Sequence, residues 1–75
     1  MNNLTSVWVV TEKDNSGNVM PSQIVWKDGR RFNIERVLHT FYPEDGITSY
    51  TVVVGNRQKM LIKQNERWYV NSIHN

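Results

Sequence analysis

Residues 30–42, RRFNIERVLHTFY, are compatible with two different secondary structures. Four apolar residues recur at helical spacing: Ile34, Val37, Leu38 and Phe41. Against a helix stand the many β-branched and aromatic residues and a turn signal just upstream. As a strand, the segment needs one extra residue near Glu35 and Arg36 to keep its apolar side chains on one face, which is what a β-bulge provides. We favour the bent strand, because it lets one long strand serve two halves of a small barrel.

Outside this segment, the sequence consists of short strand-like runs separated by tight turns. Asp28-Gly29 lies between two such runs, and glycine accepts the positive φ that a hairpin turn demands. Gly55-Asn56 gives a second signal of the same kind. An antiparallel meander must hide its edge strands, and closing into a small barrel does so. We therefore expect an all-β antiparallel meander of five or six strands that forms an SH3-like or half-open barrel.

The composition is that of one small domain without covalent cross-links. The chain has 75 residues and no cysteine, so we treat residues 1–75 as a single domain that has neither a disulfide nor a thiolate metal site. No apolar run approaches the roughly 20 residues that span a membrane. Residues 1–10 lack the basic start of a secretion signal. The expected location is the cytoplasm, with no membrane contact.

The turn and core residues also carry a resemblance to known sequences. The pattern is W-x-D-G-R-x-F-x-I over residues 26–34 and R-W-Y-V over residues 67–70. It resembles the pattern of a group of short uncharacterised bacterial proteins. The resemblance implies a small bacterial cytoplasmic β-domain, and it carries over no activity, cofactor or site residue.

The sequence offers little for catalysis or for metal binding. A structural zinc site needs about four nitrogen or sulfur ligands, whereas the chain has two histidines and no cysteine. Residues 14–18, DNSGN, begin like a calcium loop, but Val25 stands where that loop needs a bidentate Glu. His39 is the candidate base for a Ser or Thr nucleophile, and no Ser lies in a Gly-flanked elbow. We therefore expect no enzyme activity, no catalytic residue, no cofactor and no bound metal.

The distribution of charge favours a binding function. The net charge is only +2, but residues 46–75 carry four Lys or Arg and one acidic residue. Basic residues flank the tight turns beside aromatic rings, and such strips bind single-stranded nucleic acid by base stacking and phosphate contacts. The predicted strip consists of Arg30, Arg31, Lys59, Lys63, Arg67 and Tyr69. The alternative is that these basic residues only discourage edge-to-edge aggregation.

Protein association is the second binding hypothesis. Three Trp are many for so small a core, and a ring left exposed among apolar neighbours is a typical protein-binding anchor. We name Trp8 and Trp68 as the candidate anchors. The partner is then either a foreign protein or a second copy of the chain, which would form a homodimer through an uncovered edge strand.

Overall fold

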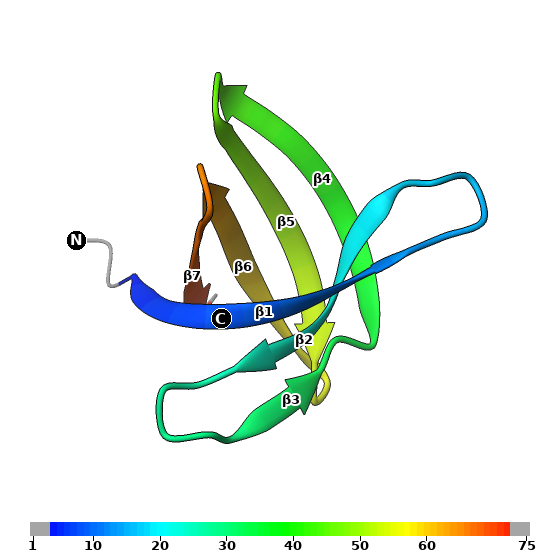
Figure 1. The fold of residues 1–75 in the computed structure, drawn as a ribbon. Coiled ribbons are helices and arrows are strands. Elements are labelled where there is room, and N and C mark those ends of the chain that lie inside the picture. The colour runs from blue at the N-terminus through cyan, green and yellow to red at the C-terminus, as the bar shows by residue number, and fades with distance from the viewer. Residues whose placement is uncertain (1–3, 73–75) are drawn as a thin grey trace.

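The computed structural model describes residues 4–72, and all the regular secondary structure in that range is β-strand. Seven strands follow one another along the chain: β1 (Thr5–Lys13), β2 (Val19–Val25), β3 (Arg31–Asn33), β4 (Arg36–Glu44), β5 (Ile47–Val54), β6 (Arg57–Gln64) and β7 (Arg67–Ser72). All pairs are antiparallel, and the order across the sheet is β3-β2-β1-β7-β6-β5-β4. The sheet curls into a half-open barrel, with β1 paired to β7 in its middle (Figure 1). The all-β fold predicted from the sequence is confirmed.

β3 and β4 are two parts of one bent ribbon. The Ile34 amide donates to the Ser22 carbonyl of β2 at 2.9 Å, and the next amide, that of Glu35, donates to the Val53 carbonyl of β5 at 2.8 Å. Successive residues therefore bind strands from the two halves of the sheet, which curls the sheet towards closure. Residues 30–42 form no helix, and the bent-strand interpretation is confirmed.

The predicted count of five or six strands was too low. The difference arises at this bend, because the change of hydrogen-bonding partner divides the single expected strand into β3 and β4. The bulge also lies later than predicted. The register of β4 against β5 shifts at Leu38, between Val37 and His39, rather than near Glu35 and Arg36.

Both predicted hairpin turns are confirmed, and each depends on residues with positive φ. Gly29 has a φ of 93°, and its amide donates to the Trp26 carbonyl at 2.9 Å. Gly55 and Asn56 have φ values of 57° and 66°, the pair of positive angles typical of a two-residue hairpin turn. These local conformations set the registers of β2 with β3 and of β5 with β6.

The loop at residues 14–18 is a self-contained turn. The Asp14 carboxylate accepts the amides of Ser16 at 2.8 Å and Asn18 at 2.9 Å. The bond from the Asn18 amide is the main cause that holds the pKa of Asp14 below its ordinary value of 3.8. The acidic side chain therefore serves the turn that joins β1 to β2.

The core lies on the concave side of the curled sheet. Its buried members are Val7, Ile24, Tyr50, Val52, Val54, Leu61 and Val70. Tyr50, Leu61 and Val70 lie opposite one another on β5, β6 and β7, so period-two alternation brings one apolar residue from each strand to the same layer. We term this side of β4–β7 the inner face and the opposite side the outer face. Burial of Tyr50 raises the pKa of its hydroxyl above 10.0.

None of the described residues belongs to a helix with the length and hydrophobicity that crossing a membrane requires.

Candidate nucleic-acid interface

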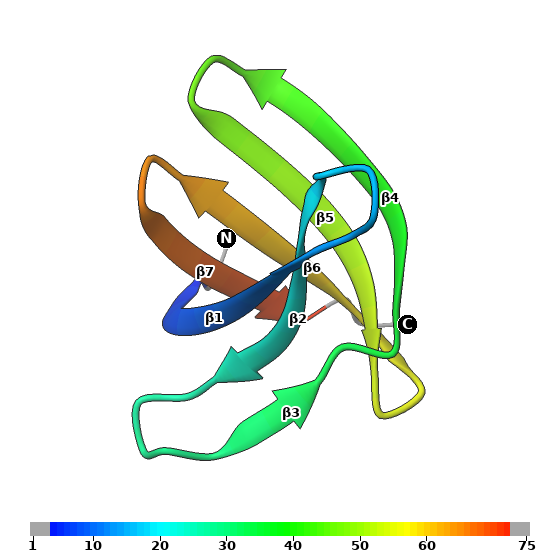
Figure 2. The same cartoon turned by 45° about the vertical axis from the view of Figure 1, so that its right-hand side comes forward.

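Most turns of the barrel gather at two opposite ends, whereas the β1–β2 loop projects to one side (Figure 1). The β2–β3 turn, the β5–β6 turn and the β3–β4 bend lie at one end, the lower end in Figures 1 and 2. The β4–β5 and β6–β7 turns lie at the other end, where the Asn65 amide donates to the Gly46 carbonyl at 3.1 Å. Segments distant in sequence are thus brought together at each end.

Basic residues concentrate at the lower end. Six Lys or Arg residues lie on its turns and at the strand ends beside them: Lys27, Arg30, Arg31, Arg36, Arg57 and Lys59. Asp28 and Glu35 are the carboxylates among them, so this end has a formal charge of +4 and the rest of the chain has −2. We term this region the basic end. The net charge of +2 is therefore the sum of a strongly basic end and a weakly acidic remainder.

A groove of about 260 Å³ opens at the basic end. One wall comes from the β2–β3 hairpin and consists of Trp26, Arg30 and Phe32. The other comes from the β5–β6 turn and the start of β6 and consists of Gly55, Arg57 and Lys59. Ile24 and Val54, both part of the core, form its apolar floor. Trp26 and Phe32 meet edge to face, with ring centroids 6.3 Å apart and an interplanar angle of 87°. The groove therefore combines aromatic surface with three cationic side chains.

Arg30 lies over the aromatic pair. Its guanidinium carbon is 6.0 Å from the centroid of the Trp26 ring and 5.9 Å from that of Phe32. Asp28 holds it there, with 2.7 Å between Arg30 Nε and Asp28 Oδ2. The bond from the Arg30 amide to the same carboxylate is the main cause that lowers the pKa of Asp28 below 3.8. Both side chains are more than half exposed, so this ion pair contributes little stability and leaves Arg30 able to move.

Glu35 connects the bend to the wall of the groove. Its Oε2 accepts the Gly55 amide at 2.8 Å, although 20 residues separate the two in sequence. Its own amide binds Val53 in the same strand that leads into the β5–β6 turn. Glu35 thus orients the turn that presents Arg57. No sequence pattern predicts this role, because nothing local to Glu35 indicates that Gly55 is near.

The structure brings together only two members of the predicted basic strip. Arg30 and Lys59 line the same groove. Arg31, on β3, donates instead to the Gln23 side chain on β2 at 3.0 Å. Lys63 is at the opposite end of β6, roughly 13 Å along the strand from Lys59, with its Nζ 5.7 Å from the Trp68 ring.

The other two members of the predicted strip lie on the outer face. Arg67 pairs with Gln64, and Tyr69 pairs with Ile62, so both point away from the side that carries Lys63. The strip is therefore divided between two faces and two ends of the barrel. The structure places Trp26, Phe32 and Arg57 beside Arg30 and Lys59 instead.

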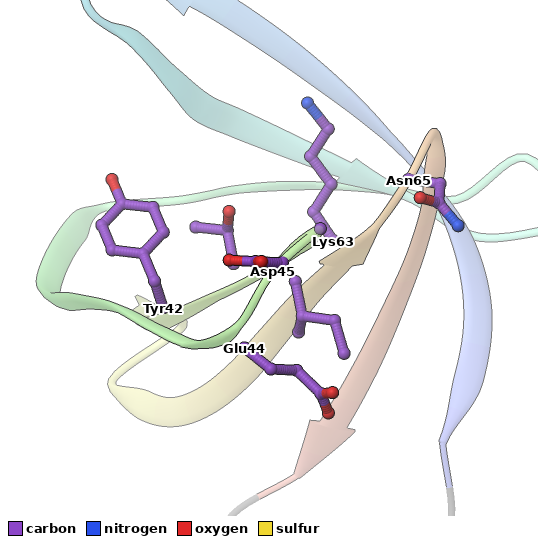
Figure 3. Close-up of a pocket in the computed structure, with 8 residues that line it drawn as sticks. Tyr42, Glu44, Asp45, Lys63 and Asn65 are labelled. Carbon is purple, nitrogen blue, oxygen red and sulfur yellow. The ribbon is translucent and has the colours of Figure 1, made fainter.

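A larger hollow at the opposite end has a different character. It measures about 510 Å³ and is lined by polar residues of both charge signs, among them Tyr42, Asp45, Lys63 and Asn65. Figure 3 shows the side chains of Tyr42 and Lys63 extending to the same side, whereas the Glu44 carboxylate points the opposite way. Its lining includes one cation, Lys63, and two acidic residues, Glu44 and Asp45, so this hollow is less suited to a polyanion than the basic end.

The two candidate protein-binding anchors have different environments. Trp68 packs against the core and stacks on Tyr50, with 5.8 Å between the ring centroids. Trp8 is 61% exposed on the outer side of β1. Trp8 is therefore the more accessible anchor of the two.

Within residues 4–72, no three His, Cys, Asp or Glu side chains are grouped so that they could hold a metal ion. His39 is exposed on the outer face, opposite Thr51.

No protein-family model matches this chain, and no curated protein or solved structure does.

Proposed function

We propose that this protein is a non-enzymatic binding module that holds single-stranded nucleic acid at its basic end. The observation that carries the proposal is the groove itself. Trp26 and Phe32, with Arg30 over their rings, line one wall, and Arg57 and Lys59 line the facing wall. Stacking on aromatic rings contributes roughly 1–3 kcal/mol per base and tolerates any base, while cationic side chains follow the phosphates.

In the proposed complex one base enters the groove. The groove is slightly smaller than the roughly 300–1,000 Å³ of typical small-molecule pockets, which suits a single unstacked base. Arg30 moves off the aromatic pair, or stacks on the far side of the base, because its bond to Asp28 is exposed to solvent. Arg57 and Lys59, on the facing wall, contact the flanking phosphates.

The expected binding is weak and depends on salt. Because Arg57 and Lys59 contact phosphates, we expect log K to fall with log salt concentration with a slope of about −1.4 for single strands. The charge of +4 at the basic end supports this attraction, and the net charge of +2 limits it.

Fluorescence anisotropy of a labelled oligothymidine tests the proposal, in salt from about 50 to about 200 mM. We expect the double variant Arg57→Glu/Lys59→Glu to lose at least about tenfold in affinity, or about 1.4 kcal/mol. The matched control is Lys13→Glu/Lys63→Glu, which makes the same change of charge away from the groove and should bind nearly as the wild type does.

Two results would contradict the proposal. One is the absence of binding at tens of micromolar protein in low salt. The other is an equal loss in both double variants, which would mean that overall charge, and not the groove, attracts the nucleic acid. Quenching of tryptophan fluorescence that disappears in Trp26→Phe would support stacking in the groove.

Protein association is the second candidate function, favoured by the exposure of Trp8. Association through the exposed Trp8 side chain fits the structure better than pairing along an edge strand. β4 is the long edge strand, and it carries register shifts at Leu38 and between Phe41 and Glu44, with Pro43 inside the second. Bulges and proline are features that discourage edge pairing. Sedimentation equilibrium over a concentration series tests self-association. A monomer at every concentration would exclude self-association and leave only a foreign protein as the partner.

We further propose that the barrel is SH3-like and that the protein acts in the bacterial cytoplasm. The resemblance of residues 26–34 and 67–70 to short bacterial proteins supports the location. Fractionation of bacterial cells that express the native gene tests it, and recovery outside the cytoplasm would refute it.

A further inference from the structure

The outer face of β4–β7 is apolar or neutral in its middle and charged only near its border. Two successive cross-strand rows contain no Lys, Arg, Asp or Glu: Phe41–Ser49–Ile62–Tyr69 and His39–Thr51–Met60–Asn71. The next row towards the β4–β5 and β6–β7 turns is Glu44–Ile47–Gln64–Arg67. We term the side chains of Phe41, Ile47, Met60, Ile62 and Tyr69 the outer patch.

The outer patch is accessible to solvent, although Ser49 at its centre is buried. Phe41 is 46% exposed, and the other four members are partly exposed. Ser49, between Phe41 and Ile62, is 3% exposed, and its Oγ has no hydrogen-bond partner among the described residues. A centre rich in aromatic side chains and Met, depleted of charge and bordered by polar groups, is typical of protein interfaces.

The charges at the border of the outer patch favour a second copy of this chain as the partner. Glu44 and Arg67 stand at opposite ends of one cross-strand row, and in Figure 3 Glu44 points away from the side that Tyr42 and Lys63 occupy, that is, towards the outer face. Consider two copies whose outer faces meet, related by a two-fold axis that runs parallel to the strands and lies between the two sheets. Each cross-strand row then faces the same row of the second copy, with the order of the four strands reversed. Glu44 of one copy then faces Arg67 of the second copy, and Phe41 faces Tyr69 of the second copy.

We propose that two copies of this chain associate through their outer patches about such an axis, with a Glu44–Arg67 ion pair at each border. The arrangement is isologous, so the same contacts occur twice. It leaves both basic ends outside the contact, and it is independent of the proposed nucleic-acid function.

The size of the outer patch predicts a weak, reversible dimer. Three rows two residues apart span roughly 13 Å, and four strands span roughly 14 Å. That footprint is well below the roughly 800 Å² per partner of stable complexes. Association should therefore depend on protein concentration, and salt should weaken it through the two border pairs.

Sedimentation equilibrium from about 10 μM to about 1 mM protein tests the proposal. The average mass should rise with concentration from the 8.9 kDa of one chain towards twice that value. Phe41→Lys should weaken association at least about tenfold. Ile62→Lys is a second variant with the same expected result, and circular dichroism establishes that each is folded. Val10→Lys, at an exposed apolar position on β1, is the matched control and should associate as the wild type does.

Charge reversal tests the two-fold arrangement itself. Glu44→Arg and Arg67→Glu should each weaken the dimer several-fold, and the double variant should restore it, because the border pairs re-form with opposite polarity. A protein that stays monomeric to about 1 mM, or association unaffected by Phe41→Lys, would overturn the proposed surface. A double variant no stronger than the single ones would overturn the axis. Loss of nucleic-acid binding in Arg57→Glu/Lys59→Glu should leave the dimer intact, so the two proposals fail separately.

Discussion

Replacing Leu61 by Ala should remove a large part of the stability of the domain. Leu61 is fully buried at the centre of β6, between Tyr50 on β5 and Val70 on β7. The substitution deletes three carbon atoms, worth about 2.4 kcal/mol of transfer free energy at about 0.8 kcal/mol for each. The cavity left behind adds to this loss, and Leu→Ala changes in cores cost about 2–5 kcal/mol in total.

This loss is a large fraction of the free energy of unfolding of the domain. A domain of this length has a free energy of unfolding of roughly 4–11 kcal/mol, at about 0.05–0.15 kcal/mol per residue. At about 4–8 °C for each kcal/mol, the midpoint of thermal unfolding should fall by at least about 8 °C. The m-value of urea unfolding should remain unchanged if the native state stays compact.

The matched control is Met60→Ala, one residue earlier on the same strand. Met60 lies on the outer face and is only partly buried, so its loss should cost about 1 kcal/mol or less. Urea unfolding followed by tryptophan fluorescence, at low micromolar protein where the proposed dimer is dissociated, measures both variants. Equal losses at the two positions would refute the assignment of inner and outer faces on β6, and with it the layer of Tyr50, Leu61 and Val70.

Two further predictions concern the turns. Gly29→Ala should destabilise the domain by about 1–2 kcal/mol, because a φ of 93° is strained for any residue with a Cβ; calorimetry measures it, and an unchanged midpoint would contradict the turn geometry. Acid should also weaken the turns. Asp14 and Asp28 have pKa values lowered in the folded state, so their contribution is present above pH 3.8 and is lost as the pH falls through the folded values. The fall in melting temperature between about pH 6 and pH 3 should therefore be smaller in Asp14→Asn/Asp28→Asn than in the wild type, and an identical fall would contradict this.

Local chemistry alone determined the β-strands and the tight turns of this protein. Alternation of apolar residues in β5 predicts the buried layer of Tyr50, Val52 and Val54, and Asp28-Gly29 and Gly55-Asn56 predict hairpins because glycine adopts positive φ without strain. Such signals act over a few residues, so the sequence is sufficient to locate them. It also favours a bent strand over a helix for residues 30–42, from the same residue preferences.

The composition of the candidate site was decided by the tertiary structure. The two-residue turn at Asn65 and Glu66 places Tyr69 opposite Ile62, and one residue more in that turn would have moved Tyr69 to the face of Lys63. The grouping of Trp26 and Arg30 with Arg57 depends on the bend at Ile34 and Glu35, where two consecutive amides bind different halves of the sheet. Neither fact is encoded in a local pattern, because strand pairing depends on which distant backbone groups satisfy one another.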